Sequence, residues 1–183
     1  RPMLRFTSCQ SPIADAFFGD IVAQLASTLD VQATMQWDAD EDARLLGLAR
    51  GAVDAGWISG WEYVQAIQAK TPYELLAAPV MAGARYGDEP VHFSDVIVRG
   101  DSAFHAFADL RGAHWLSSKP NSHSGHHIAR YALAQRRLGA DFFGSRTFSG
   151  GQAESVHLVL ARAGDAAAID STVLEAMVGA NPA

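Results

Sequence analysis

Cysteine is almost missing from this sequence. Cys9 is the only one in 183 residues, which excludes a disulfide within the chain. A lone thiol suits a cytoplasmic protein and equally a periplasmic protein that needs no covalent cross-link. Apolar runs are also short, and none reaches the ~18 residues that a transmembrane helix needs. No charged segment followed by an apolar stretch opens the chain, so we expect a signal peptide to be absent or already removed, and the sequence to begin inside a longer gene product.

Positive charge is scarce. The chain has 14 Lys and Arg against 20 Asp and Glu, for a net charge of −6. A nucleic-acid surface needs clustered cations to displace counterions from phosphates. Arg136-Arg137 is the one basic doublet, and it falls where the C-terminus of a predicted helix favours cations. We therefore predict no nucleic-acid partner. With 49% hydrophobic residues, the chain has enough apolar side chains for a core.

The common catalytic and cofactor motifs are missing as well. The sequence has no G-x-S-x-G nucleophile elbow, no P-loop and no G-x-G-x-x-G after a strand. Three histidines lie within five positions, His123, His126 and His127. The last two point about 100° apart on a helix, and no Asp, Glu or Cys stands nearby to complete a zinc site. We predict no metal, no cofactor and no enzymatic activity.

Short β-rich runs alternate with helical runs along the whole chain, which indicates an α/β fold with mostly parallel sheets flanked by helices. We expect strands at 4–7, 31–37, 53–59, 93–99, 113–117, 142–148 and 166–170. We expect helices after Ser11-Pro12 and at 40–50, 61–69, 102–110, 124–138, 152–163 and 172–178. Helices drop out between residues 73 and 93, which suggests a crossing between two lobes. The predicted division is a first lobe at 1–90, a second at 91–170, and the start of a return to the first at 171–183.

The sharpest functional segment is the loop and helix start at residues 117–125, Ser-Ser-Lys-Pro-Asn-Ser-His-Ser-Gly. The first N–H groups of a helix lack intrahelical partners, and the helix dipole adds positive potential there. A tetrahedral oxyanion can use these groups together with the hydroxyls of Ser122 and Ser124. Gly125 allows close approach, and His123 lies inside the loop. The plainer alternative is that Ser122 simply caps the helix, the more common use of serine at this position.

Two other segments have open interpretations. Gly150-Gly151 precedes the helix from Gln152 and forms either a second anion-facing helix start or, as we favour, a tight turn. Asp170 ends a strand, where a carboxylate also commonly caps the next helix.

Several segments, taken in order, resemble the phosphate, phosphite and phosphonate substrate-binding family of ABC transporters. Residues 51–60, Gly-Ala-Val-Asp-Ala-Gly-Trp-Ile-Ser-Gly, are similar to the family's G-x-hydrophobic-D-x-x-W segment. Residues 109–112 and then 122–126 resemble its D-L-x-G and S-x-S-G segments. Residues 149–151 and 164–171 resemble its closing G-x-x-D-A-A-x-I-D-S stretch. The order and spacing agree over nearly the whole chain.

The resemblance implies a two-lobed type II periplasmic-binding fold whose S-x-S-G helix start binds the phosphorus oxyanion. Where the family's crossing carries an aromatic hydroxyl, this chain has Phe93, which cannot donate, and Ser94 is a possible substitute. Where the family often has a histidine after the glycine pair, this chain has the neutral Gln152. Family members also continue beyond the point that corresponds to Ala183, which implies a truncated or short form. The predicted ligand-binding residues are Ser11, Ser59, Phe93, Ser94, Ser122, His123, Ser124, Gly125, Gln152 and Asp170.

We therefore expect a solute-binding protein that captures phosphate, phosphonate or phosphite for an ABC transporter. Its partners would be the small oxyanion and the membrane permease, and we expect a monomer that is periplasmic or attached to the cell surface. The alternative is a ligand-sensing domain of the same fold from a regulator or a sensor kinase.

Overall fold

The computed structural model describes residues 3–37 and 40–180, and it forms two compact units, Arg1–Leu75 and Leu76–Ala183. The division comes earlier than the predicted lobe boundary at residue 90. Tyr86 packs within the second unit, where it is 2% exposed and its hydroxyl donates to Glu175 Oε1 at 2.7 Å. Residues 171–180 also belong to the second unit, and the return of the chain end to the first lobe stays a prediction.

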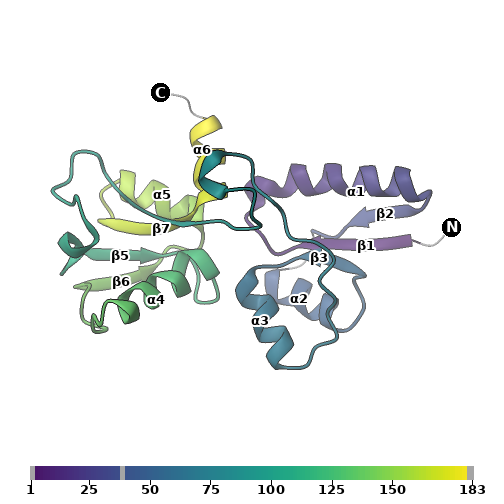
Figure 1. The fold of residues 1–183 in the computed structure, drawn as a ribbon, viewed down its shortest axis with the longest axis horizontal. Coiled ribbons are helices and arrows are strands. Elements are labelled where there is room, and N and C mark those ends of the chain that lie inside the picture. The colour runs from purple at the N-terminus through teal and green to yellow at the C-terminus, as the bar shows by residue number, and fades with distance from the viewer. Residues whose placement is uncertain (1–2, 38–39, 181–183) are drawn as a thin grey trace. The chain divides into compact units, whose positions relative to one another are not determined.

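The first unit is a three-stranded parallel sheet in the order β2-β1-β3 with its crossover helices (Figure 1). Its elements are β1 (Met3–Ser8), α1 (Asp15–Leu29), β2 (Gln32–Met35), α2 (Glu41–Ala49), β3 (Ala55–Trp57) and α3 (Gly60–Gln68).

Side-chain caps explain where two of these helices start. The Asp40 carboxylate accepts from Ala43 N–H at 2.8 Å before α2. Ser59 and Glu62 form a reciprocal capping box at α3. Ser11 behaves differently from prediction, because a single 3-10 turn intervenes before α1 and the Ser11 side chain makes no capping bond.

Spacing alone places Phe17, Ile21 and Leu25 on one face of α1. In the structure, however, Phe17 is 61% exposed, and the buried residues of the helix are Phe18 and Val22. Phe18 packs on Trp57 with ring centroids 4.6 Å apart. The helix is apolar on more than one side, so the spacing of its residues is compatible with more than one buried face. Contact with Trp57 selects the face that carries Phe18.

The second unit is a four-stranded sheet in the order β4-β7-β5-β6. Its strands are β4 (Ser94–Val98), β5 (His114–Ser117), β6 (Ser145–Phe148) and β7 (Ala166–Asp170), and its helices are α4 (Ile128–Gln135), α5 (Gln152–Leu160) and α6 (Ser171–Ala180). β5 runs parallel to β6 and β7, whereas β4 pairs antiparallel with β7. The sheets are thus mostly parallel, as expected, and β4 is an antiparallel strand at the edge of the sheet. An antiparallel edge strand on an otherwise parallel sheet is common in α/β folds.

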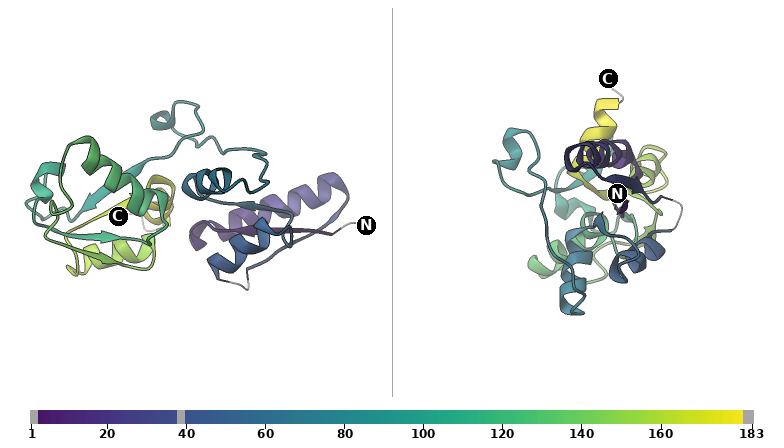
Figure 2. Two further views of the ribbon diagram at one scale, coloured as in Figure 1. Left: turned by 90° about the horizontal axis from the view of Figure 1, so that it is seen from below. Right: turned by 90° about the vertical axis from the view of Figure 1, so that its right-hand side faces the viewer.

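Helices cover both faces of this sheet, with α5 on one side and α4 on the other (Figures 1 and 2). Trp115 packs into one hydrophobic cluster with Phe142 and Phe143, and its neighbour Leu116 packs into the other with Ile169 and Val159. The alternation of side chains along a strand produces this division. Residues 166–169 of β7 are at most 1% exposed, as expected for a central strand buried on both faces.

Two expected elements are absent from the described residues as regular structure. The helix predicted at 102–110 is only a 3-10 turn, Phe107–Leu110. Asp109 accepts from the N–H groups of His105 and Ala106, both at 2.8 Å, and thereby holds the chain extended before that turn. Residues 73–81, predicted to be extended, form no strand because they have no sheet partner.

Candidate ligand-binding site

The loop that follows β5 enters its helix through a π-turn, His123–His127, which continues into α4. The expected single α-helix at 124–138 therefore differs at both ends. Ser122 is the cap, and its Oγ accepts from Gly125 N–H at 3.1 Å. The first backbone hydrogen bond of this helix runs from His127 N–H to the Ser122 carbonyl oxygen at 3.1 Å. The amides of residues 123–126 therefore precede the regular backbone hydrogen bonds of the helix. π-turns occur often at functional sites.

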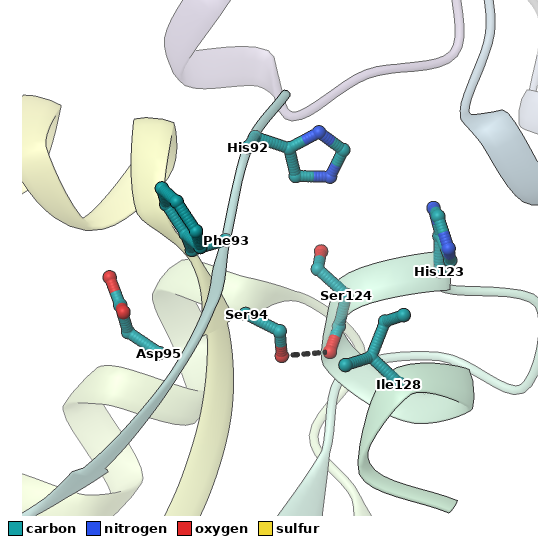
Figure 3. A pocket seen from close by; sticks show the side chains of 7 residues that line it. All are labelled: His92, Phe93, Ser94, Asp95, His123, Ser124 and Ile128. Atoms are coloured by element: carbon teal, nitrogen blue, oxygen red, sulfur yellow. Dashed lines mark hydrogen bonds between the residues drawn. The ribbon is translucent and has the colours of Figure 1, made fainter. Parts of the chain in front are cut away.

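Three separate segments meet at Ser124. The start of β4 lies beside the end of β7, since Ser94 is paired with Asp170 in the sheet. Ser94 Oγ donates to the Ser124 carbonyl oxygen at 2.7 Å, as Figure 3 shows. Ser124 Oγ in turn donates to Asp170 Oδ2 at 3.3 Å. The pairing of β4 with β7 thus brings the start of one strand and the end of the other to the helix start after β5.

Gln152 completes this arrangement from the start of α5. Its Nε2 donates to Ser124 Oγ at 3.0 Å, and its Oε1 accepts from Asp170 N–H at 2.5 Å. Gln152, Ser124 and Asp170 therefore form a closed ring of hydrogen bonds, which we call the Ser–Asp–Gln ring. Gly150 before it has a φ of +93°, a conformation that favours glycine in a turn. Whether the start of α5 also faces an anion stays a prediction.

The Asp170 carboxylate has four nearby donors. Oδ1 accepts from Thr172 N at 2.9 Å and from Thr172 Oγ1 at 2.7 Å, so it also begins α6 as a cap. Oδ2 faces Ser124 and, at 3.1 Å, His92 Nε2. The side chain is 15% exposed, which makes it a largely shielded acceptor group. The geometry of Asp170 is therefore compatible both with a role as the cap of α6 and with a role in ligand binding.

An open pocket of about 360 Å³ lies in front of Ser124 within the second unit. Its lining includes the imidazoles of His92 and His123 and the apolar side chains of Phe93 and Ile128 (Figure 3). The residues that line it are His92, Phe93, Ser94, Asp95, His123, Ser124 and Ile128.

His123 is shielded in a way that keeps it neutral. Burial lowers the pKa of His123 below its usual value, the neighbouring His92 lowers it further, and Asp170 opposes the shift. The two rings meet edge to face with centroids 5.9 Å apart. A neutral imidazole offers a ligand one N–H donor without a full charge.

Most of the predicted site residues do come together in the second unit. Phe93, Ser94, His123 and Ser124 line the pocket, and the remaining four directly adjoin Ser124. Those four are Ser122, Gly125, Gln152 and Asp170. The roles of all eight in binding stay predictions.

Ser11 and Ser59 belong to the first unit. They follow β1 and β3, which are neighbours in that sheet, at the carboxyl edge where α/β proteins commonly bind ligands. The Ser59 hydroxyl accepts from Glu62 N–H at 3.2 Å as a cap. Their part in a site stays a prediction.

Sequence reasoning missed His92, Asp95, Ile128 and Thr172. The position of His92 directly before Phe93, which the resemblance marked, was the available signal. Asp95 follows Ser94 on β4, but an exposed acid on an edge strand gives no signal of its own. Thr172 follows Asp170 closely enough to form a local hydrogen-bonded turn, a pattern that sequence can suggest.

Features of other functional classes are absent from the part of the chain that the structure describes. Among residues 3–37 and 40–180, no group of three or more His, Cys, Asp or Glu side chains is placed to hold a metal ion. Within the same residues, no helix combines the length and the apolar character needed to cross a membrane.

Comparison with known proteins decides the family. The family model for the periplasmic substrate-binding protein of phosphonate ABC transporters matches residues 6–183. The chain belongs to this family. Its members are substrate-binding components of transporters rather than enzymes. A search of curated protein sequences finds no match.

Solved structures of this family have the same fold. PhnD1 from Prochlorococcus marinus, in complex with methylphosphonate, matches with a TM-score of 0.80 and 22% identity over 98% of this chain. A binding protein component of an ABC phosphonate transporter from Pseudomonas aeruginosa matches with a TM-score of 0.80 and 17% identity over 100% of it. The chain spans 68% and 61% of those two proteins.

A more distant match has a different ligand class in its name. The periplasmic aliphatic sulphonate binding protein SsuA from Escherichia coli matches with a TM-score of 0.65 and 19% identity, over 97% of this chain and 57% of that one. These likenesses establish the fold, which is the expected type II periplasmic-binding fold. The family to which the chain belongs supports a solute-binding role.

Proposed function

We propose that this protein captures a phosphorus oxyanion, with a phosphonate as the first candidate, and delivers it to the permease of an ABC transporter. The observation that carries the proposal is the helix start at residues 122–125, where Ser124 lies buried behind an open pocket. The amides ahead of the helical ladder, together with the dipole of the π-turn and α4, favour negative charge at this place.

The neighbouring side chains suit a small anion bound through neutral donors. His123 is shielded so that it stays neutral, and Ser94 fixes the Ser124 carbonyl and so the start of the turn. Phe93 and Ile128 add apolar surface on which a short carbon substituent could rest. The family description and the methylphosphonate complex of PhnD1 support the same ligand class.

The proposal also assigns to this protein the location and the partners that are typical of its family. A substrate-binding protein of an ABC importer works in the periplasm or at the cell surface, and it presents its closed, liganded form to the permease. We propose that this chain does so as a monomer.

The proposal is tested by a thermal-shift panel followed by calorimetry. The ligands are methylphosphonate, aminoethylphosphonate, phosphite, phosphate and sulfate. A ligand that binds only the native state raises the melting temperature in relation to its affinity. We expect at least one phosphorus oxyanion to raise it, and absence of a shift with every phosphorus oxyanion would refute the proposal.

Ser124→Ala is the decisive variant, and Ser27→Ala is its matched control because Ser27 is exposed on α1. Ser124→Ala should weaken binding of the best ligand about 10- to 100-fold, because it removes a hydroxyl from the anion site and leaves Asp170 with one donor fewer. Ser27→Ala should leave the affinity unchanged. Equal affinities for wild type and Ser124→Ala would remove Ser124 from the site.

A further inference from the structure

Positive charge gathers in one part of this acidic chain. Between Arg111 and Arg146 the sequence has six Lys and Arg and one acid, a net charge of +5, whereas the whole chain has −6. The exposed arginines of this stretch are Arg111, Arg130, Arg136, Arg137 and Arg146. In the part of the chain that the structure describes, none of these five forms an ion pair, while four other arginines each pair with an aspartate. The second unit therefore has a positive surface without its own counter-charges.

Three of these guanidinium groups are held in place by the aromatic core. The Arg146 Cζ atom lies 5.4 Å from the centroid of the Phe143 ring. Arg111 and Arg136 lie over neighbouring phenylalanine rings in the same way, at 4.9 and 5.0 Å. Arg146 also donates to the Ala140 carbonyl oxygen. A stacked guanidinium presents its donors in a fixed plane, the geometry that matches a carboxylate, and it loses little rotamer freedom on binding.

Strand β6 carries Arg146 along an open edge of the sheet. It is the outermost strand in the order β4-β7-β5-β6, as Figure 1 shows, and all four of its residues are exposed. The amides of Ser145 and Ser149 donate to carbonyl oxygens on the β5 side. Because the direction of the backbone groups alternates along a strand, those of Arg146 and Phe148 point away from β5. This edge can therefore pair with another extended segment.

A shallow hollow lies beside this edge, between β6 and α4. Arg146 of β6 and Arg130 of α4 line it together with His126. Burial lowers the pKa of His126, and both arginines add to the shift, in keeping with their place near this ring. Phe148 contacts His126 with ring centroids 5.2 Å apart and is 50% exposed, and Tyr131 on α4 is 61% exposed. Arginine and aromatic residues are enriched in protein–protein interfaces, whereas lysine is depleted.

The side chains on this edge define the chemistry of a strand that pairs there. Arg146 and Phe148 are two residues apart, so they lie on the same face of the sheet, the face on which the hollow lies. An added strand with acids at alternate positions brings carboxylates to Arg146 and Arg130. A second copy of β6 brings arginine against arginine, and like charges disfavour that pairing. A phospholipid surface or a nucleic acid can use the arginines but not the backbone groups of the edge.

We propose that the edge of β6 and the hollow beside it bind an extended, acidic segment of a partner protein as an added strand. The main chain of β6 supplies the pairing, and Arg130 and Arg146 select the acidic sequence. None of Arg130, Tyr131, Arg146 and Phe148 lines the oxyanion pocket, so the inference does not rest on the proposed function.

The probe is a fluorescein-labelled peptide of eight residues in which glutamate and threonine alternate. The control peptide has glutamine in place of each glutamate. Fluorescence anisotropy with the whole chain at low salt should show that the glutamate peptide binds at least about tenfold more tightly, because its hydrogen bonds to arginine are charge-assisted. Its affinity should fall at 150 mM NaCl, which screens exposed charges. Absence of binding, or equal affinities for the two peptides, would overturn the proposal.

The double variant Arg130→Gln/Arg146→Gln tests the surface itself. It should weaken binding of the glutamate peptide at least about tenfold. The matched control is Arg50→Gln/Lys70→Gln, which removes the same charge from exposed residues of the first unit and should change the affinity less than about twofold. Equal losses in the two double variants would show that net charge attracts the peptide, which refutes the assignment. If the first variant fails to fold, Arg130→Gln alone should still weaken binding about threefold, since only an exposed side chain changes.

Strand addition has a separate test. Two further glutamate–threonine peptides carry N-methyl groups, one on every glutamate amide and the other on every threonine amide. Only one of these two sets of amides can face β6, so one peptide should bind at least about fivefold more weakly than the other. Equal binding of both would show that the segment does not pair as a strand. Arginine-dependent binding to phosphatidylglycerol vesicles, without binding of the peptide, would make the surface a membrane contact and overturn the proposal.

Discussion

Gly125 packs directly on Ser118, the first residue after β5. A Cβ placed on Gly125 would overlap Ser118 Oγ, and Ser118 Cβ would lie only 2.9 Å from it. Ser118 is 1% exposed, and its Oγ has no hydrogen-bond partner among the described residues. The loop therefore returns onto its own strand at a place where only a glycine fits, and this close approach sets the position of the π-turn.

Gly125→Ala should accordingly destabilise the protein by about 1–3 kcal/mol, the usual cost of overpacking a buried site. It should also weaken oxyanion binding, because the turn must shift away from Ser118. Urea denaturation gives the first quantity, and calorimetry with methylphosphonate gives the second.

Ser118→Gly serves as the partner variant, since it removes two of the three atoms that the new methyl group would meet and leaves only Ser122 Oγ, at 2.9 Å. In the double variant, part of the stability lost in Gly125→Ala should return, with a coupling energy of about 1 kcal/mol or more. Additive effects of the two substitutions would show that this contact is not what requires glycine.

Ser122→Ala tests whether Ser122 is mainly a cap. Its Oγ accepts from Gly125 N–H at 3.1 Å, so the substitution should cost about 1 kcal/mol of unfolding free energy. Ser122→Asp keeps an acceptor at the cap but adds a negative charge. It should retain most of the stability while lowering oxyanion affinity at least tenfold by charge repulsion. An alanine variant as stable as wild type would disprove the capping role.

The histidines of the π-turn should make stability depend on pH. Burial lowers the pKa of His123, His126 and His127 in the folded state, below the usual value of 6.5. The unfolded chain therefore takes up protons first as the pH falls, so stability should decrease between pH 7.5 and pH 5.

Urea denaturation at pH 7.5, 6.5, 5.5 and 5.0 measures this dependence. His126→Gln should flatten it, whereas His105→Gln, on an exposed residue outside the turn, should leave the slope as it is. Equal stability across this range would contradict the assignment, because the depressed pKa values require a proton uptake on unfolding.

Cys9 should be inert while the first unit is folded. The side chain is buried, and burial together with the nearby Glu62 raises its pKa to about 12. Only a minute fraction is then thiolate at pH 8, and the thiolate is the reactive form. Labelling with Ellman's reagent should be slow in buffer and complete within minutes in 8 M urea, and rapid labelling of the folded protein would refute this prediction.

Local signals in the sequence were sufficient for much of the fold. Asp40 and the Ser59–Glu62 pair begin their helices as residue type and spacing indicate, and β7 is the buried apolar strand that residues 166–170 predict. The helix start at Ser122 was located from its hydroxyls and Gly125. The family resemblance, carried by ordered motifs, is confirmed by the family model.

What sequence could not provide depends on contacts between distant segments. The Ser–Asp–Gln ring exists because β4 lies antiparallel beside β7, a pairing that periodicity does not specify. The place of His92 beside Asp170 follows from the same pairing. The π-turn, instead of a plain α-helical start, reflects the close packing of Gly125 on Ser118, and helix propensity carries no information about such a contact.

The most direct test of the central claim is a crystal structure of the protein with methylphosphonate. The account predicts phosphonate oxygens within about 3 Å of backbone amide nitrogens among residues 123, 124 and 126, since the Gly125 amide donates to Ser122 Oγ. A methylphosphonate bound at another place, with these amides directed into packed protein, would contradict it.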